Sequence, residues 1–124
     1  MTGIETEVTA DTGSSNSIRL VLDRTAASSP EGYRLKVGKR DITITGSSEA
    51  GIFYGIQTLR KSLPVTGQKE ISFPAVQILD EPEYRYRGMH LDVGRHFFST
   101  DFIKKYIDII ALHNLNTFHW HLTG

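Results

Sequence analysis

The sequence predicts an α+β fold in which a small β-sheet layer with one packed helix is followed by a single strand-helix-strand unit. Two observations lead to this prediction. Apolar and polar residues alternate in several short runs, interrupted once by a helical spacing, and the last third of the chain shows strand, helix and strand patterns. We therefore divide the chain into a polar segment (1–17), an α+β domain (18–84) and a strand-helix-strand tail (85–124).

The first expected elements are three strands in which apolar residues occupy every second position. They read SIRLVLD from Ser17, YRLKVG from Tyr33 and DITITG from Asp41. The GKRD sequence between the second and third has the composition of a turn, which predicts an antiparallel hairpin. A fourth strand is expected in FPAVQILDEP, which ends at Pro82.

One amphipathic helix is expected between the third and fourth strands. Its apolar residues recur at helical spacing, at Ile52, Phe53, Ile56, Leu59 and Leu63. Ser47 and Ser48 are candidate N-caps, and Pro64 ends the helix. Gly51 and Gly55 lie inside it, four residues apart, which favours a close approach of helix and sheet over a ligand contact.

The tail begins with a strand, YRGMHLDV, and continues with a helix, STDFIKKYIDIIALHNL. Ser99 or Thr100 is the expected N-cap of this helix, with Asp101 in its first turn. NTFHWHL is a second strand. A strand, a crossover helix and a strand of this length predict a parallel pair, the building unit of a barrel or of a doubly wound sheet.

Composition limits the partners. The 124 residues hold 14 basic and 14 acidic side chains, so no overall field attracts nucleic acid or an anionic membrane, and the expected partner is neutral or small. The chain has no cysteine, which excludes disulfides and thiolate chemistry. No run approaches the ~18 apolar residues of a membrane helix. Localisation stays open, and a periplasmic or secreted protein fits if a signal peptide was removed.

The chemistry is concentrated in the tail. Reacting groups of parallel α/β folds sit at the C-terminal ends of the strands. Arg95 and His96 follow the first tail strand, and His119 and His121 lie at the end of the second, so both groups are expected at one rim. Residues two apart on a strand share a face, so an interior face lined by four polar residues is predicted: His90, Asp92, His119 and His121.

The residues alone are compatible with two chemical interpretations of this rim. His119 and His121 could place two imidazole nitrogens on one metal ion, as in metal-dependent hydrolases, although no other ligand cluster is evident. Alternatively Arg95 could donate parallel hydrogen bonds to the vicinal hydroxyls of a sugar. A plain ion pair is an equally frequent role for a lone Arg.

The tail also carries a specific motif. It reads R-G-x-x-L-D-x-x-R-H before the helix and L-N-x-F-H-W-H-L after it, and it includes Arg87, Gly88, Leu91, Asp92, Arg95, His96, Leu115, Asn116, Phe118, His119, Trp120, His121 and Leu122. This motif resembles the opening of the catalytic barrel of glycoside hydrolase family 20, the β-N-acetylhexosaminidases. The preceding SSEAGIFYGIQTLRKSL and FPAVQILDEP are similar to the small α+β domain before that barrel.

The resemblance implies a retaining glycosidase that removes terminal N-acetylglucosamine or N-acetylgalactosamine, with the substrate's own 2-acetamido group as nucleophile and with no metal or other cofactor. The implied roles are hydrogen bonding of the sugar 3- and 4-hydroxyls by Arg95, and support near the pocket floor by Asp92, His96, His119 and His121. After H-W-H-L-x the family commonly has Asp, whereas this chain has Gly124.

The family's catalytic Asp-Glu pair lies on a later barrel strand, beyond residue 124, and the adjacent Asp80 and Glu81 are expected to be solvated turn residues. The tail then corresponds to the first βαβ unit of a truncated (β/α)8 TIM barrel, and the chain is expected to be an inactive fragment. Its uncovered strand edges and inner sheet face predict self-association or a partly disordered tail. A metal-dependent hydrolase and a non-catalytic sugar-binding module are the alternatives.

Overall fold

The computed structural model describes residues 16–64 and 72–124. It divides into two compact units, Met1–Pro82 (unit 1) and Glu83–Gly124 (unit 2), and each is described by itself. The expected polar segment 1–17 lies almost wholly outside the described residues. Within the part of the chain that is described, no helix has the length and apolar character that a membrane crossing needs.

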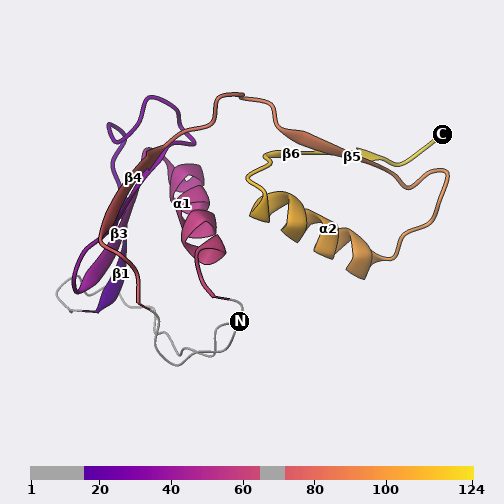
Figure 1. Cartoon of the computed structure of the whole chain (residues 1–124). Coiled ribbons are helices and arrows are strands. Elements are labelled where there is room, and N and C mark those ends of the chain that lie inside the picture. The colour runs from indigo at the N-terminus through magenta and orange to yellow at the C-terminus, as the bar shows by residue number, and fades with distance from the viewer. Residues whose placement is uncertain (1–15, 65–71) are drawn as a thin grey trace. The chain divides into compact units, whose positions relative to one another are not determined.

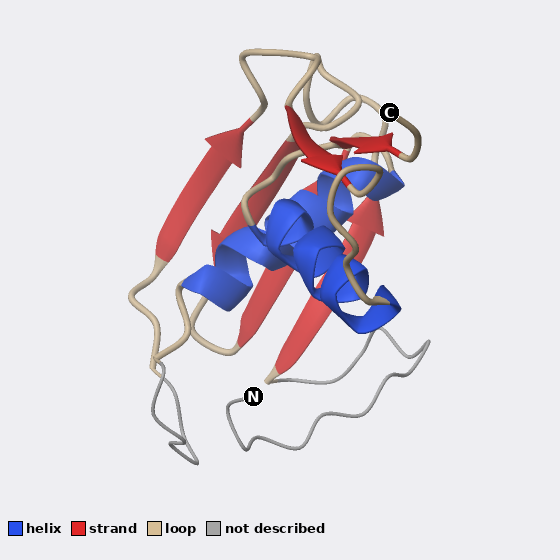
Figure 2. Ribbon diagram, turned by 90° about the vertical axis from the view of Figure 1, so that its right-hand side faces the viewer, coloured by secondary structure: helices blue, strands red, loops and turns tan. Residues whose placement is uncertain are grey.

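Unit 1 is a four-stranded sheet with one helix packed on it (Figure 1, Figure 2). Its elements are β1 (Ser17–Leu22), β2 (Tyr33–Val37), β3 (Asp41–Gly46), α1 (Glu49–Lys61) and β4 (Val76–Asp80). The strands lie in the order β1-β3-β2-β4. β2 and β3 form the predicted antiparallel hairpin, closed where Gly38 N donates to Asp41 O at 2.8 Å.

The edge strand β1 pairs with β3 in parallel, an arrangement that alternation alone does not specify. The register places Ile18 beside Ile42 and Leu20 beside Ile44, on the face that carries α1. The helix packs mainly over β3 and β2, so Ile18 and Leu20 remain 53% and 55% exposed. The apolar face of β1 was predicted correctly, but α1 covers it only in part.

The core of unit 1 lies between α1 and the central strands. Its buried members are Tyr33, Leu35, Ile44, Tyr54 and Leu59. A Cβ added to Gly55 would overlap the Ile44 side chain and lie 3.2 Å from the Tyr33 ring, and one added to Gly51 would overlap the Gly32 carbonyl. The two glycines therefore allow α1 to approach the sheet closely, as the sequence predicted.

The expected side-chain cap at the start of α1 is absent from the structure. Ser48 occupies the N-cap position in an extended conformation, but its hydroxyl donates to the Pro30 carbonyl and caps no helix N–H. The Ser47 hydroxyl likewise donates to Ser29 O at 2.5 Å. Both serines thus fasten the loop before β2 to the beginning of the helix, because their hydroxyls donate to carbonyls of that loop instead of accepting from helix amides.

Polar groups at the end of β4 also hold unit 1 together. The Tyr33 hydroxyl donates to Asp80 Oδ2 at 3.1 Å and bonds Thr58 Oγ1 at 2.5 Å, and burial raises the pKa of Tyr33. Glu81 accepts from the Ser28 hydroxyl at 2.8 Å, and this bond holds the pKa of Glu81 below its usual range. The neighbouring carboxylates Asp80 and Glu81 are exposed, as expected, but Asp80 is the last residue of β4 and not a turn residue, because it pairs with Tyr33 of β2.

Unit 2 contains β5 (Gly88–Asp92), α2 (Thr100–Leu112) and β6 (Thr117–His121). β5 and β6 pair in parallel with α2 as the crossover, which confirms the predicted strand-helix-strand unit. The predicted cap of α2 is also present, since Ser99 Oγ accepts from Phe102 N at 3.3 Å. The helix ends with Asn114 at a positive φ of 59°, where Leu115 N returns to Ile110 O at 3.1 Å.

Replacement of Gly55 by alanine tests the close approach of α1. Alanine should raise helix propensity by up to ~1 kcal/mol, yet the clash with Ile44 and Tyr33 should lower the free energy of unfolding by about 1–3 kcal/mol net. The measurement is urea unfolding followed by circular dichroism. Arg60→Ala, an exposed change on the same helix, should stay within about 0.5 kcal/mol. A Gly55→Ala protein as stable as the parent would show that α1 does not depend on this contact.

Candidate rim site of the strand pair

The register of β5 against β6 places the polar residues of both strands on one face. His90 lies opposite His119, and Asp92 lies opposite His121. The alternate residue Phe118 lies on the side of α2, where its ring centroid is 5.5 Å from that of Tyr106. The face expected to carry His90, Asp92, His119 and His121 therefore forms as predicted, because side chains alternate strictly along a strand.

Hydrogen bonds at the beginning of the pair fix this register. Arg87 O accepts from Asn116 N at 2.9 Å and from Thr117 N at 3.0 Å, while Asn116 Oδ1 accepts from Arg87 N at 3.0 Å. The Asn116 amide also donates to Arg85 O at 2.6 Å, and the Arg87 side chain donates to Asn114 O at 2.9 Å. Arg87 and Asn116, both motif residues, thus join the two strands before the ladder starts.

The segments that follow the two strands lie side by side. Val93 N donates to His121 O at 3.0 Å, which extends the pairing by one step. Gly94 is so close to the end of the chain that a Cβ there would lie 3.1 Å from Gly124 N and 3.3 Å from Leu122 O. The C-terminal ends of β5 and β6 therefore meet at one rim, which is the convergence that the sequence pattern indicated.

Asp92 organises the loop at this rim and holds Arg95. Asp92 Oδ1 accepts from Gly94 N at 2.9 Å and from Arg95 N at 3.2 Å, and Asp92 Oδ2 receives Arg95 Nη1 at 2.7 Å. The Arg95 side chain is the main cause that holds the pKa of Asp92 below its usual range. Arg95 remains 77% exposed, so its guanidinium is anchored at one nitrogen and open to a ligand.

Three imidazoles gather on the same face. The ring centroid of His90 lies 4.7 Å from that of His119 and 5.9 Å from that of His121. The Nε2 atom of His121 is buried and has no hydrogen-bond partner. His96 does not belong to this group, because it lies in the loop after β5 with its ring 5.1 Å from that of Phe98.

A chain of aromatic contacts, which the sequence analysis did not identify, connects this loop to α2 and β6. Successive ring centroids lie 4.7–6.2 Å apart along Phe98, Phe102, Tyr106, Phe118 and Trp120. The sequence signal that could have predicted these contacts is the spacing of four residues between Phe98, Phe102 and Tyr106, because residues four apart lie on one side of a helix. These contacts fix the loop that carries Arg95 and His96 against the helix.

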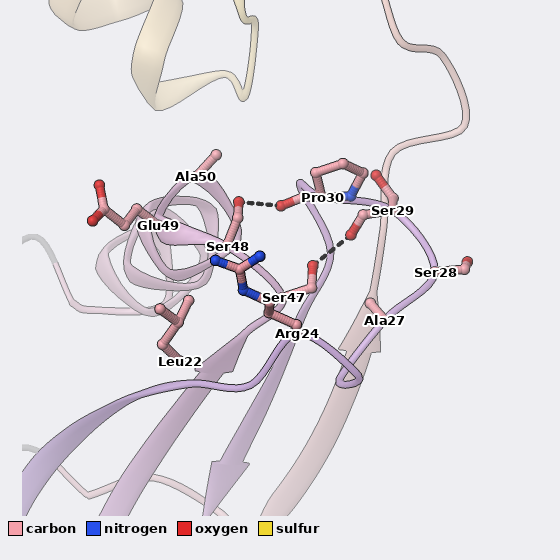
Figure 3. A pocket seen from close by; sticks show the side chains of 10 residues that line it. All are labelled: Leu22, Arg24, Ala27, Ser28, Ser29, Pro30, Ser47, Ser48, Glu49 and Ala50. Carbon is pink, nitrogen blue, oxygen red and sulfur yellow. Dashed lines mark hydrogen bonds between the residues drawn. The ribbon is translucent and has the colours of Figure 1, made fainter.

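Unit 1 has an open hollow of about 560 Å³ at the start of α1 (Figure 3). It is lined by Leu22, Arg24, Ala27, Ser28, Ser29, Pro30, Ser47, Ser48, Glu49 and Ala50. The hydroxyls of Ser47 and Ser48 are already donated to loop carbonyls, as the dashed lines in Figure 3 show. These two hydroxyls are therefore engaged within the protein, and the rim of unit 2, which carries the specific sequence motif, is the stronger candidate.

Comparison with protein families matches the chain to two consecutive models. The model described as Glycosyl hydrolase family 20, domain 2, matches residues 1–81. The model described as Glycosyl hydrolase family 20, catalytic domain, matches residues 84–124. The boundary between the two matches coincides with the division between the two compact units at Pro82 and Glu83.

Individual proteins with similar sequences are named as hexosaminidases. A beta-hexosaminidase of Porphyromonas gingivalis is 47% identical over 116 residues, covering 89% of this chain and 15% of the relative. A beta-N-acetylhexosaminidase of Cellulomonas fimi is 36% identical over 111 residues, covering 90% of this chain and 22% of the relative. The chain thus spans only 15% to 22% of the length of these two proteins.

Solved structures of the same family share the fold. The β-N-acetylhexosaminidase of Bacteroides fragilis matches with a TM-score of 0.78 and 38% identity over 86% of this chain and 21% of that one. A mutant β-hexosaminidase of Streptomyces plicatus, solved in complex with the product GlcNAc, matches with a TM-score of 0.74 and 41% identity over 85% of this chain and 22% of that one. On these matches, this mixed α+β chain belongs to glycosyl hydrolase family 20.

Proposed function

We propose that this chain supplies the α+β domain and the first strands of the catalytic domain of a β-N-acetylhexosaminidase. The enzyme removes terminal N-acetylglucosamine or N-acetylgalactosamine from glycans with retention of configuration. The observation that carries the proposal is Arg95, exposed at a rim of parallel strand ends and held by Asp92, in a chain of family 20. Relatives named beta-hexosaminidase and a related structure with bound GlcNAc support it.

The proposed division of the chain follows the sequence analysis. Residues 18–84 form the α+β domain that precedes the barrel, and residues 85–124 form the first βαβ unit of a (β/α)8 barrel. The parallel pair β5–β6 with its crossover helix supports this assignment, since that unit is the repeat from which such barrels are built.

Arg95 is assigned the role of binding the sugar. Its 2.7 Å bond to Asp92 fixes one nitrogen of the guanidinium and leaves the rest of the fork to donate to the 3- and 4-hydroxyls. Asp92 acts through Arg95 and is a positioning residue. His96, His119 and His121 are placed near the pocket floor, where they support the strand ends.

The chemistry itself is assigned to residues outside this chain. The 2-acetamido oxygen of the substrate attacks the anomeric carbon while a general acid protonates the departing glycosidic oxygen, and water then opens the cyclic intermediate. We place the Asp-Glu pair that orients the acetamido group and transfers the proton beyond residue 124. Asp80 and Glu81 are not candidates, because they bond Tyr33 and Ser28 within unit 1.

Hydrolysis of a chromogenic N-acetylglucosaminide tests the assignment. The 124-residue chain should release no chromophore above background, whereas the protein translated from the full open reading frame that contains it should be active. A chelator should leave that activity unchanged, because the reaction uses the acetamido group of the substrate and no metal. Turnover by the 124-residue chain, or loss of activity with the chelator, would contradict the proposal.

Substitution of Arg95 in the active full-length protein tests its role in binding the sugar. Arg95→Ala should lower kcat/KM about 100-fold or more, because two hydrogen bonds from a charged donor are each worth about 1.5–3 kcal/mol. Arg95→Lys should recover part of the loss, since it keeps the charge without the planar fork. The matched control is His113→Ala at the exposed end of α2, which should keep full activity. Equal kinetics for Arg95→Ala and this control would remove the assignment.

Self-association of the 124-residue chain is also proposed, through the uncovered strand pair. Trp120 and Leu122 are 47% and 60% exposed there, and exposed apolar strands pair with other chains. Light scattering should give a mass that rises with concentration, and Leu122→Lys should reduce the rise. A mass equal to that of one chain at every concentration, with slow amide exchange in β5 and β6, would contradict it.

A further inference from the structure

Arg95 lies in the loop between β5 and α2, and this loop is held at both of its ends. At the end next to β5, Asp92 accepts the Gly94 and Arg95 amides at 2.9 and 3.2 Å and the Arg95 guanidinium at 2.7 Å. At the end next to α2, the Phe98 ring stacks on the Phe102 ring, with centroids 4.7 Å apart and an interplanar angle of 20°. Arg95 thus stands between a carboxylate anchor and an aromatic anchor.

We propose that Phe98 is a positioning residue for Arg95, whose ring holds the loop so that the guanidinium meets the 3- and 4-hydroxyls of the terminal sugar. Phe98 acts through the loop backbone and is assigned no contact with the sugar. Because Phe98 acts through Arg95, this role rests on the proposed function.

The bonds from Asp92 alone hold the guanidinium weakly. The Arg95 side chain is 77% exposed, and an ion pair at such a position is screened by water and contributes little. Holding a long arginine side chain in one conformation costs rotamer entropy, which a single exposed bond offsets poorly. The backbone that carries this side chain therefore needs a further contact to stay in place.

Phe98 has the location that such a contact requires. It directly precedes Ser99, the N-cap of α2, whose Oγ accepts from Phe102 N at 3.3 Å. An apolar residue just before an N-cap often packs on the first turns of its helix and fixes the angle at which the chain enters the helix. Here the partner is Phe102, in the first turn. Two residues separate Phe98 from Arg95, so the anchor restricts the backbone close to the guanidinium.

This aromatic anchor is connected to both strands of the rim. The Phe102 ring lies 6.2 Å from the Tyr106 ring, which lies 5.5 Å from the Phe118 ring on β6. The Tyr106 hydroxyl donates to His90 O on β5 at 3.2 Å. The position of Phe98 is therefore fixed relative to the two strands whose ends form the rim.

The adjacent phenylalanine lacks such an anchor within unit 2. Phe97 is 85% exposed, whereas Phe98 is partly buried and contacts the rings of His96, at 5.1 Å, and Phe102. Of the two aromatic residues that follow His96, the structure thus gives the anchoring contact to Phe98.

The test uses the active full-length protein and two substrates, a chromogenic N-acetylglucosaminide and its 4-deoxy analogue. The ratio of their kcat/KM values measures the contribution of the 4-hydroxyl, and a general loss of folded enzyme leaves this ratio unchanged. The variants are Phe98→Ala and Phe98→Tyr, which keeps the ring. Arg95→Ala is the reference for complete loss of the hydroxyl contact, and His113→Ala, at the exposed end of α2, is the control.

Phe98→Ala should lower kcat/KM for the complete substrate about 10–100-fold, because a displacement of about 1 Å can cost ~100-fold. It should also move the ratio of the two substrates toward the value for Arg95→Ala, and it should add little in the Arg95→Ala background. Phe98→Tyr and His113→Ala should keep the parent ratio. A parent-like ratio for Phe98→Ala would overturn the role of Phe98, even if the activity fell.

Amide exchange of the full-length protein separates this role from the proposed function. In Phe98→Ala, the segment that contains Gly94 and Arg95 should exchange faster, because Asp92 alone then holds it. Unchanged exchange would overturn the positioning role. If the parent enzyme loses no activity on the 4-deoxy substrate or in Arg95→Ala, the assignment of Arg95 to the sugar fails, whereas faster exchange in Phe98→Ala would still show that Phe98 positions the loop.

Discussion

The parallel pairing of β5 with β6 in one fixed register is the constraint on which the rest of the rim depends. It places Asp92 opposite His121 and His90 opposite His119. A slip of one residue would transfer the partners from one strand to the opposite face and disperse the set. Arg87 and Asn116 oppose such a slip, because their backbone and side-chain hydrogen bonds join the strands before the ladder begins. Two motif residues far from the rim thereby control its geometry.

The two units use polar side chains for different purposes. In unit 1, hydroxyls and carboxylates satisfy one another or satisfy loop carbonyls, as in the bonds of Tyr33 to Asp80 and of Ser47 to Ser29. The sheet and α1 are further held by the close approach at Gly55. In unit 2, by contrast, Arg95 is anchored at one nitrogen and otherwise exposed, and His121 Nε2 has no partner. Buried polar atoms without a partner occur in both units, among them Arg19 Nε and Gln57 Oε1 in unit 1, so the feature that distinguishes the rim of unit 2 is the exposed and anchored guanidinium of Arg95.

The rim combines two kinds of ligand chemistry on one face. A guanidinium only donates hydrogen bonds, whereas an imidazole nitrogen can donate or accept one. Asp92 lies at the boundary of the two groups, since it holds Arg95 and faces His121. The aromatic contacts from Phe98 to Trp120 connect the loop that carries Arg95 to α2 and β6.

Much of this protein was determined by local sequence. The strands, both helices, the cap at Ser99 and the polar face of β5 and β6 follow from alternation, helical spacing and capping preferences, which depend on near neighbours. The tertiary structure alone decided the parallel pairing of β1 with β3, the donation of the Ser48 hydroxyl to Pro30, and the contact of His90 with the two histidines of β6. These features depend on residues distant in sequence, because register and hydrogen-bond partners are chosen by packing between elements, and a local pattern carries no information about that choice.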